Sequence, residues 1–275
     1  MAALAAAFKN ISGLVRSEQP LTDAQIVRAA PSVFADAPHD SRSARYTYIP
    51  TADIVKGLRQ EGFMPFMACQ ARSRIEGKSD YTKHMLRFRH TQQINGETAN
   101  EIILVNSHDG TSSYQMLAGC FRFVCHNGLI CGDTIEDLRI RHSGNILNNV
   151  IEGAYRIVSE FEQVEAAKER MQSIVLNPRQ QNALANAALS VRYDPEDNIP
   201  IVAQQLNQSR RWDDQGSDLW RTFNRIQENL LQGGLTGINR NGGKITTRKV
   251  TGVTENIRLN RALWTLAEEM TRLAT

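Results

Sequence analysis

The spacing of apolar positions changes near the middle of the chain. Between residues 63 and 108, three segments of strand length are separated by polar or glycine-bearing turns: FMPFMACQARSRI, HMLRFRHTQQI and NEIILVNSH. From Leu147 to Met171, apolar residues recur every three or four positions, which is the period of an amphipathic helix. The pattern therefore predicts an α+β fold, in which an antiparallel β-meander precedes a long amphipathic helix.

Capping and breaking residues set the bounds of the other predicted elements. Thr51–Gly62 starts with a threonine suited to an N-cap and ends with a glycine, which predicts a short helix ahead of the meander. The long helix after Asn145 is expected to stop at Asn177-Pro178. The C-terminal helices are expected at Gln180–Val191, Ile199–Gln208, Asp218–Gln232 (Ser217 cap, Gly233 stop) and Glu255–Leu273. The basic, glycine-rich segment GGLTGINRNGGKITTRKVTG, at 233–252, predicts a flexible hairpin.

Composition and length set the expected domain organisation. The first forty residues are rich in alanine and then broken by three prolines, so residues 1–40 are expected to be an N-terminal arm. Residues 41–275 are expected to form one α+β domain, with a β-rich core at 41–133 and a helical part at 145–275. No apolar run approaches the roughly 18–20 residues of a membrane helix. The start MAALAAAF has no basic region before it, so the cytoplasm of the cell is the expected location.

Charge is distributed unevenly along the chain, although the net charge is only +3. Residues 41–91 hold ten basic and four acidic side chains, residues 131–198 hold seven and eleven, and residues 207–250 hold eight and four. A basic, acidic, basic order favours a polyanionic partner. The alternative is that folding scatters these charges over a solvated surface.

Strand alternation sharpens the charge pattern. In the first predicted strand Arg72 and Arg74 share a face, and in the second Arg87 and Arg89 do. Two neighbouring strands could therefore place four arginines on one face of the sheet. Such a face needs phosphates or acids opposite it, and the acidic helical segment could supply the acids.

The stretch GCFRFVCHNGLICGD, at 119–133, holds three of the four cysteines and a histidine. Two local structures are possible: a hairpin with a turn at Asn127-Gly128, or a helix over Tyr114–His126 that ends at Gly128. Neither brings Cys120, Cys125 and Cys131 together as zinc requires. Cys125 and His126 are also neighbours in sequence, so their side chains diverge. We therefore expect structural thiols, no metal and no cysteine nucleophile.

Other catalytic signals are sparse. The chain has no phosphate-binding glycine loop and no HEXXH zinc motif. Asp133, Glu136 and Asp137 could hold magnesium, but three acids at a helix start are more often partners of the helix dipole. The turn NSHDG at 106–110 sets a histidine beside a carboxylate, which is either turn chemistry or a fragment of an active site.

The segments GFMPFMACQARSR, NSHDG, FRFVCHNGL and NGGKITTRKVTGVTENIRLNRALWTLAEEM carry a resemblance to a known family. They resemble the YubP/YfjQ-like domain of unknown function, found in plasmids and prophages, from about Tyr46 to the end. The resemblance implies carriage on mobile DNA in a bacterial cell, and it supplies no catalytic residue. The order of helix, meander and long helix also looks like that of phage single-strand annealing proteins of the Red-beta, RecT and Erf type, as an analogy of topology alone.

These observations predict a nucleic-acid-binding protein of a mobile element, acting in single-strand DNA binding or annealing during recombination. No enzymatic step and no cofactor is expected, and the protein is expected to form a homo-oligomeric ring or filament. Tyr46, Tyr48 and Phe66 are candidates for stacking on bases. A magnesium-dependent nuclease using Asp109, Asp133 or Asp137, and a factor that blocks a host defence protein, are the alternatives. The candidate phosphate contacts are Arg72, Arg74, Lys83, Arg87, Arg89, Arg240, Lys244, Arg248 and Lys249.

Overall fold

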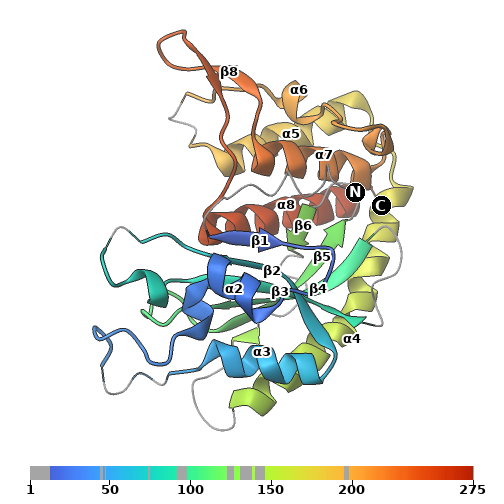
Figure 1. Cartoon of the computed structure of the whole chain (residues 1–275). Helices are drawn as coiled ribbons and strands as arrows, with labels where there is room; N and C mark the ends of the chain where they lie inside the picture. Colours follow the sequence, from blue (N-terminus) through green and yellow to red (C-terminus); the bar gives the residue numbers. More distant parts are fainter. Residues whose placement is uncertain are drawn as a thin grey trace. The chain divides into compact units, whose positions relative to one another are not determined.

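Alternating apolar side chains build a curled antiparallel sheet in the first half of the chain (Figure 1). The computed structural model describes residues 13–43, 46, 48–73, 75–91, 98–122, 127–130, 138–139, 146–194 and 198–274. By internal contacts the chain divides into unit 1, at 1–121 and 135–159, and unit 2, at 122–134 and 160–275. The fold is α+β, as predicted, with the helices concentrated in the second half.

The strands follow one another in the sheet in chain order. The order is β1-β2-β3-β4-β5-β6, and β7 pairs with β5 outside this path. The three strands predicted from the meander pattern are confirmed as β2, β3 and β4. The bounds are Leu14–Arg16 for β1, Phe63–Gln70 for β2, His84–His90 for β3, Thr98–Asn106 for β4, Gln115–Arg122 for β5, Asn127–Ile130 for β6 and Leu138–Arg139 for β7.

Helices cover one face of this sheet. They are α2 at Asp23–Ala29, the short 3-10 helix η2 at Pro31–Phe34 and α3 at Thr51–Gln60, with a further 3-10 turn, η3, at Ser79–Tyr81. The face that they cover carries Leu86, Phe88 and Leu104, all buried. Thr51 is the first residue of α3 instead of its N-cap, which is Pro50. Its hydroxyl lies 3.0 Å from Nε2 of His84, so the side chain is used in the core.

The N-terminal segment expected to be an arm is part of this layer from residue 13 on. Strand β1 pairs with β2, with Val15 opposite Ala68. Thr22 caps α2, and Ile26 and Val33 are completely buried. The expected arm is therefore corrected for residues 13–40, because apolar side chains between its prolines complete the core. Residues 1–12 lie outside the described residues.

The second half of the chain is helical. Helix α4 (Ile146–Ser173) begins in unit 1 and continues in unit 2, which also holds α5 (Pro178–Arg192), α6 (Ala203–Leu206), η5 (Trp212–Asp214), α7 (Leu219–Gln232) and α8 (Val253–Ala274). Helix α6 is shorter than the predicted Ile199–Gln208, because the carbonyl of Pro200 accepts a bond from Ile238 instead of continuing a helix. The predicted hairpin is confirmed as β8 (Thr236–Ile238) and β9 (Lys244–Thr246).

Helix α7 lies at the centre of unit 2, in contact with α5, α6 and α8. Twelve of its fourteen residues are buried, although several of them are polar. Two of those polar side chains bond to the end of α6 and to the loop that follows it: Asn229 donates to the carbonyls of Leu206 and Gln208, and Arg225 to those of Asp214 and Gly216. The helix therefore supports its neighbours by hydrogen bonds as well as by apolar packing.

The cysteine-rich stretch is extended where the structure describes it. Residues 115–122 form strand β5, which excludes the helix over Tyr114–His126. Asn127 and Gly128 belong to strand β6, so the predicted turn at these two residues is wrong. Cys120 and Cys69 are buried, and burial raises the pKa of the Cys69 thiol to about 12. Cys125, His126 and Cys131 lie outside the described residues. In the described part of the chain, no helix is long and apolar enough to cross a membrane.

Candidate nucleic-acid interface

The arginines of strand β3 lie inside unit 1. Arg87 and Arg89 are each 1% exposed, and both contact Glu101, which is fully buried on strand β4. Nη1 of Arg87 donates to Oε2 of Glu101 at 2.7 Å, and Nε of Arg89 donates to Oε1 at 2.9 Å. Each carboxylate oxygen therefore accepts from a different guanidinium, which is the geometry of a charge-assisted buried pair.

Two aromatic rings complete the surroundings of Arg89. Its guanidinium lies 4.4 Å from the ring centroid of Phe66 and 4.0 Å from that of Phe121. The pairing of β2 with β3 shifts register between Pro65 and Met67, at the position of Phe66. The cation-π contacts and the bonds to Glu101 explain how the arginine is accommodated in the core.

The register corrects the predicted four-arginine face. Arg87 pairs with Met67 of β2, so it lies on the sheet face of Met67. Side chains at even-numbered positions such as Gln70 point to the opposite face, and Arg72 was predicted on that alternation. Strand β2 ends at Gln70, and Arg72 lies beyond it, exposed. Arg87 and Arg89 cannot reach a phosphate in this conformation, and Phe66, 2% exposed, cannot reach a base. Lys83 is half-buried, and Arg74 lies outside the described residues.

Arg16 of β1 lies on the same sheet face, since it pairs with Met67 across from Arg87. Desolvation and then the charge of Arg87 lower the pKa of Arg16 to about 10, against the opposing effect of Glu101. Among the described residues of this cluster, the carboxylate of Glu101 thus serves several guanidinium groups. The sequence signal for the pairing was available in Glu101, but only the register of β3 and β4 reveals it.

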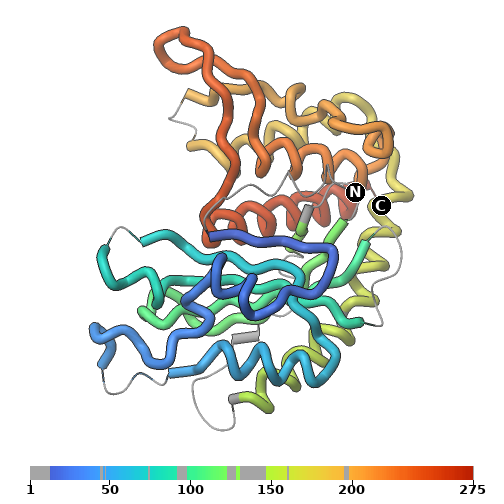
Figure 2. Tube along the Cα trace, in the orientation of Figure 1, coloured from blue at the N-terminus to red at the C-terminus, as the bar shows by residue number. Residues whose placement is uncertain are grey.

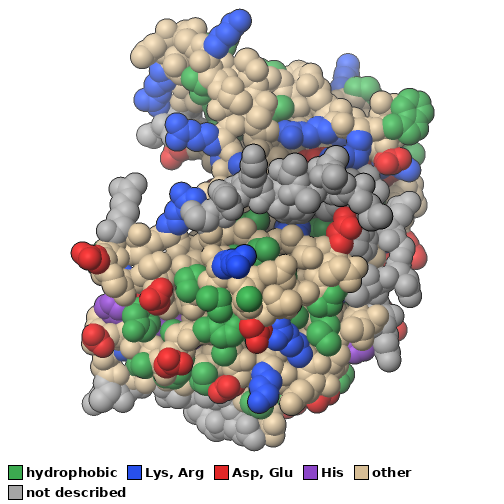
Figure 3. Space-filling view, viewed as in Figure 1, with side chains coloured by type: hydrophobic (Ala, Val, Ile, Leu, Met, Phe, Trp, Pro, Cys, Tyr) green, Lys and Arg blue, Asp and Glu red, His purple; other side chains and the backbone are tan. Residues whose placement is uncertain are grey.

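The basic hairpin differs from the sheet cluster because its cations are exposed. Arg240, Lys244, Arg248 and Lys249 all reach solvent, and residues 233–252 include no acidic residue. The hairpin projects from the helices of unit 2 (Figures 1 and 2), and basic side chains line it in the space-filling view (Figure 3). These four predicted contacts are therefore together and accessible.

Local bonds give the hairpin a defined shape. At its tip, Oδ1 of Asn239 accepts from the backbone N–H of Asn241 and of Gly243, both at 2.9 Å. Gly242 there has φ of 76°, a conformation that glycine adopts without strain. Along strand β8, Gln205 donates to the carbonyl of Thr236 and Asn198 to that of Ile238. The predicted flexible hairpin is thus bonded both at its tip and along one strand.

The base of the hairpin is tied to the loop before α7. Gly233 ends α7 with φ of 63°, and a Cβ added there would lie 2.6 Å from the carbonyl oxygen of Thr247. The Gly233 carbonyl accepts a bond from Arg210, whose Nε also donates to Oδ1 of Asn229 at 2.6 Å. The hairpin and the 207–218 loop therefore share one anchor. The sequence did not indicate this loop as part of the interface, because the residues it bonds to lie about twenty positions away with no local pattern to mark them.

The NSHDG turn belongs to a buried polar cluster. His84 and His108 are fully buried, with ring centroids 5.2 Å apart, and the hydroxyl of Thr51 lies between their Nε2 atoms at 3.0 and 3.5 Å. Nδ1 of His84 lies 3.0 Å from the hydroxyl of Ser32. Burial, and then the nearby His108, lowers the pKa of His84 to about 3, and burial lowers that of His108 to about 4. Both imidazoles are therefore neutral at pH 7, as hydrogen-bonding parts of the core.

Of the acids proposed for magnesium, Asp109 is the one that lies in the described residues. Oδ1 of Asp109 accepts from the hydroxyl and the N–H of Thr111, and Oδ2 lies 3.4 Å from Nζ of Lys78. Burial alone raises its pKa, but these hydrogen bonds and the lysine outweigh it, so the pKa of Asp109 lies below its ordinary value. Asp133, Glu136 and Asp137 lie outside the described residues. Among those described, no group of three His, Cys, Asp or Glu side chains could hold a metal ion.

The tyrosines proposed for stacking support the same turn. The hydroxyl of Tyr46 donates to the carbonyl of Ser107 at 2.9 Å, and that of Tyr48 donates to the carbonyl of Ala35. The ring of Tyr48 also lies 5.0 Å from that of His108. Both tyrosines are half-buried, and their contacts give them a structural role.

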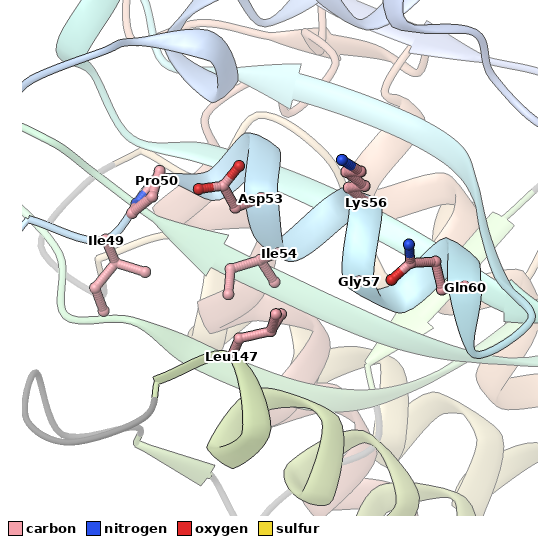
Figure 4. Close-up of a pocket in the computed structure, with 8 residues that line it drawn as sticks. All are labelled: Ile49, Pro50, Asp53, Ile54, Lys56, Gly57, Gln60 and Leu147. Atoms are coloured by element: carbon pink, nitrogen blue, oxygen red, sulfur yellow. The ribbon is translucent and has the colours of Figure 1, made fainter.

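A cavity of about 400 Å³ opens between α3 and the start of α4 in unit 1 (Figure 4). Its floor is apolar, with Ile54 and Leu147 facing each other, and Asp53, Lys56 and Gln60 lie along α3 at its side. The opposite charges of Asp53 and Lys56 favour no ligand of a particular charge. We assign this cavity no function.

Comparison with known proteins identifies relatives across nearly the whole chain. Residues 38–264 match the family model described as "Domain of unknown function (DUF932)". The UPF0380 proteins YafZ and YfjQ of Escherichia coli (strain K12) are each 50% identical over 270 residues, which cover 98% of this chain and 98% of theirs. YfjQ is one of the two proteins after which the resemblance seen in the sequence is named. No solved structure matches the chain.

The buried carboxylate generates a first prediction. Glu101→Gln should destabilise the protein by about 3–5 kcal/mol, because it leaves two buried guanidinium groups without this counter-charge. The matched control is Asp23→Asn, which disrupts the largely exposed Asp23–Arg59 pair and should cost less than about 1 kcal/mol. Urea unfolding of the two variants measures both. Equal losses would contradict a structural role for Glu101.

The histidine cluster generates a second prediction. Both pKa values are lower in the folded state than the ordinary value of 6.5, so the unfolded chain binds protons first as pH falls. Stability should therefore be full above pH 6.5 and fall below it, down to about pH 4 for His108 and about pH 3 for His84, by up to about 1.4 kcal/mol per pH unit for each histidine. His84→Gln should make this slope shallower. Val27→Ala, at an exposed position without a titratable side chain, is the control and should leave the slope unchanged.

Proposed function

We propose that this chain, which belongs to the DUF932 family of domains of unknown function, binds single-stranded nucleic acid through its β8–β9 hairpin. The observation that carries the proposal is the exposure of four cations on a projecting segment that has no acidic residue. Phosphates bind to such a surface because each contact releases condensed counterions. The proposed phosphate contacts therefore lie on the hairpin and not on Arg87 and Arg89 of the sheet, which are buried.

The shape of the hairpin supports this assignment. Bonds from Asn239, Asn198 and Gln205 hold it away from the collapsed conformations that a glycine-rich segment would otherwise sample. A preorganised cationic ribbon loses less conformational entropy on binding than a flexible one. Lys244 and Lys249 offer point charges, while Arg240 and Arg248 can each make two bonds to one phosphate.

The wider biological role is part of the same proposal. Binding of single-stranded DNA would serve annealing and recombination of mobile DNA in the cytoplasm of a bacterial cell. Annealing needs no reaction catalysed by side chains and no cofactor. It requires several nucleotides to be held with their bases accessible, and sequence-tolerant contacts to phosphate and base achieve this.

The hairpin generates a third prediction. The double variant Lys244→Ala/Arg248→Ala should weaken binding of a fluorescent oligothymidylate and reduce the slope of log affinity against log salt by about 1.4, from ~0.7 per lost contact. The control is Arg170→Ala/Arg179→Ala, which removes the same charge from exposed positions in unit 2. Fluorescence anisotropy at four salt concentrations measures both.

The outcomes separate the candidate functions. If the hairpin variant binds as tightly and with the same slope as the parent, the proposed interface is wrong. If the control pair weakens binding equally, the effect comes from net charge and not from the hairpin. Cleavage of the oligonucleotide when magnesium is added would favour a nuclease, and retention of one host protein without DNA would favour a factor that counteracts host defence.

Assembly is the fourth prediction. A single hairpin contacts few nucleotides, so annealing would require repetition of the interface in a homo-oligomer, as a ring or a filament. Strand β1 stands at the end of the sheet order, so its outer edge is a place where a second copy could add a strand. Light scattering should give a mass well above that of a dimer, alone or with a long single strand. A monomer of 30.8 kDa under both conditions would remove annealing and leave simple binding.

A further inference from the structure

Trp212 is the most exposed tryptophan of the chain. Its exposed fraction is 81%, whereas the other two tryptophans, Trp220 and Trp264, are 4% and 1% exposed. A tryptophan gains more than almost any other side chain from leaving water, so an outward-facing one calls for a physical reason. A scattered apolar side chain at the surface is common, and the surroundings of Trp212 distinguish it from that case.

The loop around Trp212 is anchored on both sides. Before it, both terminal nitrogens of Arg211 donate to the carboxylate of Glu228, at 2.8 and 2.6 Å, and Nη1 also donates to Asp214 at 3.0 Å. After it, the carbonyl of Asp213 accepts from Nε of Arg221 at 3.2 Å. The carbonyl of Trp212 itself accepts from the N–H of Gln215 at 2.9 Å, which closes the turn.

These anchors fix the tryptophan in its exposed position. Asp214 is buried and also accepts from Arg122, so the turn is held by charge-assisted bonds inside unit 2. Burying the indole would require the loop to break several of them. The neighbours of Trp212 therefore bond inward to α7 and the core, while its own ring remains at the surface. Such a ring is preorganised to receive a flat partner at little conformational cost.

The charge of the neighbourhood indicates which flat partner fits. Arg210 and Arg221 are exposed and lie before and after the turn in the sequence; Arg221 also pairs with Asp218, and Asp213 is the exposed carboxylate among residues 207–217. An exposed planar ring with arginines before and after it in the sequence suits a ligand that alternates flat faces with negative charge. Single-stranded nucleic acid has this composition, and its unpaired bases can stack on an aromatic side chain. A duplex keeps its bases stacked on each other.

The tryptophan loop continues into the proposed interface. Arg210, two residues before Trp212, donates to the carbonyl of Gly233 at the base of the hairpin. Gly233 in turn lies against Arg248, whose carbonyl carbon would be 2.6 Å from a Cβ added to the glycine. The loop contacts α7 near its start, at Arg221, and just past its end, at Gly233. These two positions are twelve residues apart, which is about 18 Å of helix. One strand could contact the hairpin and the ring together.

We propose that Trp212 is a stacking platform for an unpaired base of single-stranded nucleic acid whose phosphates lie on the β8–β9 hairpin. This inference rests on the proposed function and adds the residue that distinguishes single strands from duplexes. The phosphate contacts provide salt-dependent affinity. The ring provides affinity that depends on unpaired bases and not on salt.

Intrinsic fluorescence tests the inference directly, because the other two tryptophans are buried. Titration with oligothymidylate should quench the emission of the parent, and the variant Trp212→Phe gives the background of Trp220 and Trp264. Heparin, a polyanion without bases, should bind without this quenching. Quenching by heparin equal to that by oligothymidylate would overturn the stacking role.

Affinity provides an independent readout. Trp212→Ala should bind oligothymidylate about five- to 150-fold more weakly than the parent, with the same salt slope, and Trp212→Phe should lose less. Val175→Ala, at another strongly exposed apolar position, is the matched control and should bind like the parent. Melting curves check that each variant is folded, which an exposed position favours.

The results distinguish failure of this inference from failure of the proposed function. If binding depends on Lys244 and Arg248 but Trp212→Ala binds as tightly as the parent without loss of quenching, stacking is wrong and the hairpin function stands. If the parent does not retain oligothymidylate at low salt, both are wrong. A Trp212→Ala variant that weakens duplex and single strand equally would also overturn the stacking role.

Discussion

The polar face of helix α7 is the constraint on which the proposed interface depends. Asn229, Glu228 and Arg225 are buried in the middle of unit 2, where an unbonded polar group would be costly. Each side chain bonds to the loop that precedes the helix, and Arg210 extends this network to Gly233. The position of Trp212 and the origin of the hairpin are thus set by the same requirement that the buried groups of one helix be satisfied.

In unit 1, buried polar side chains are instead stabilised by an ion pair. The alternation along β3 places Arg87 and Arg89 on one face, and the register with β4 brings Glu101 to them. Phe66 and Phe121 then enclose the Arg89 guanidinium, so the cluster is stabilised by an ion pair and by aromatic faces together. On the covered face of the sheet, His84 and His108 play the corresponding role as neutral donors and acceptors. Both clusters fix the meander in a single register, because a slip of one residue would leave them unpaired.

Local patterns predicted the elements well, for physical reasons that are local. The period of two in 63–108 and the period of three to four in 147–171 depend only on which side of a strand or helix must be buried. Register, partners and exposure depend on residues far apart in sequence. Arg87 and Arg72 looked equivalent until the pairing of Met67 with Arg87 separated them. Trp212 carried no signal, because its exposure follows from anchors on α7. The hairpin was found because charge and glycine content mark it locally.

The contrast between the two sets of arginines shows when a basic residue in a sequence points to a partner. An arginine in a strand has cross-strand neighbours within reach, and a single glutamate such as Glu101 can turn two such residues into structure. In the hairpin, neither strand carries an acid, and the glycines at 233, 242 and 243 have no side chain that could cover the cations. The exposed cations of that segment are accessible to a partner from outside the unit. Basic residues therefore carry functional information mainly where the segment that holds them has no acids of its own, and segment 233–252 meets that condition in its sequence.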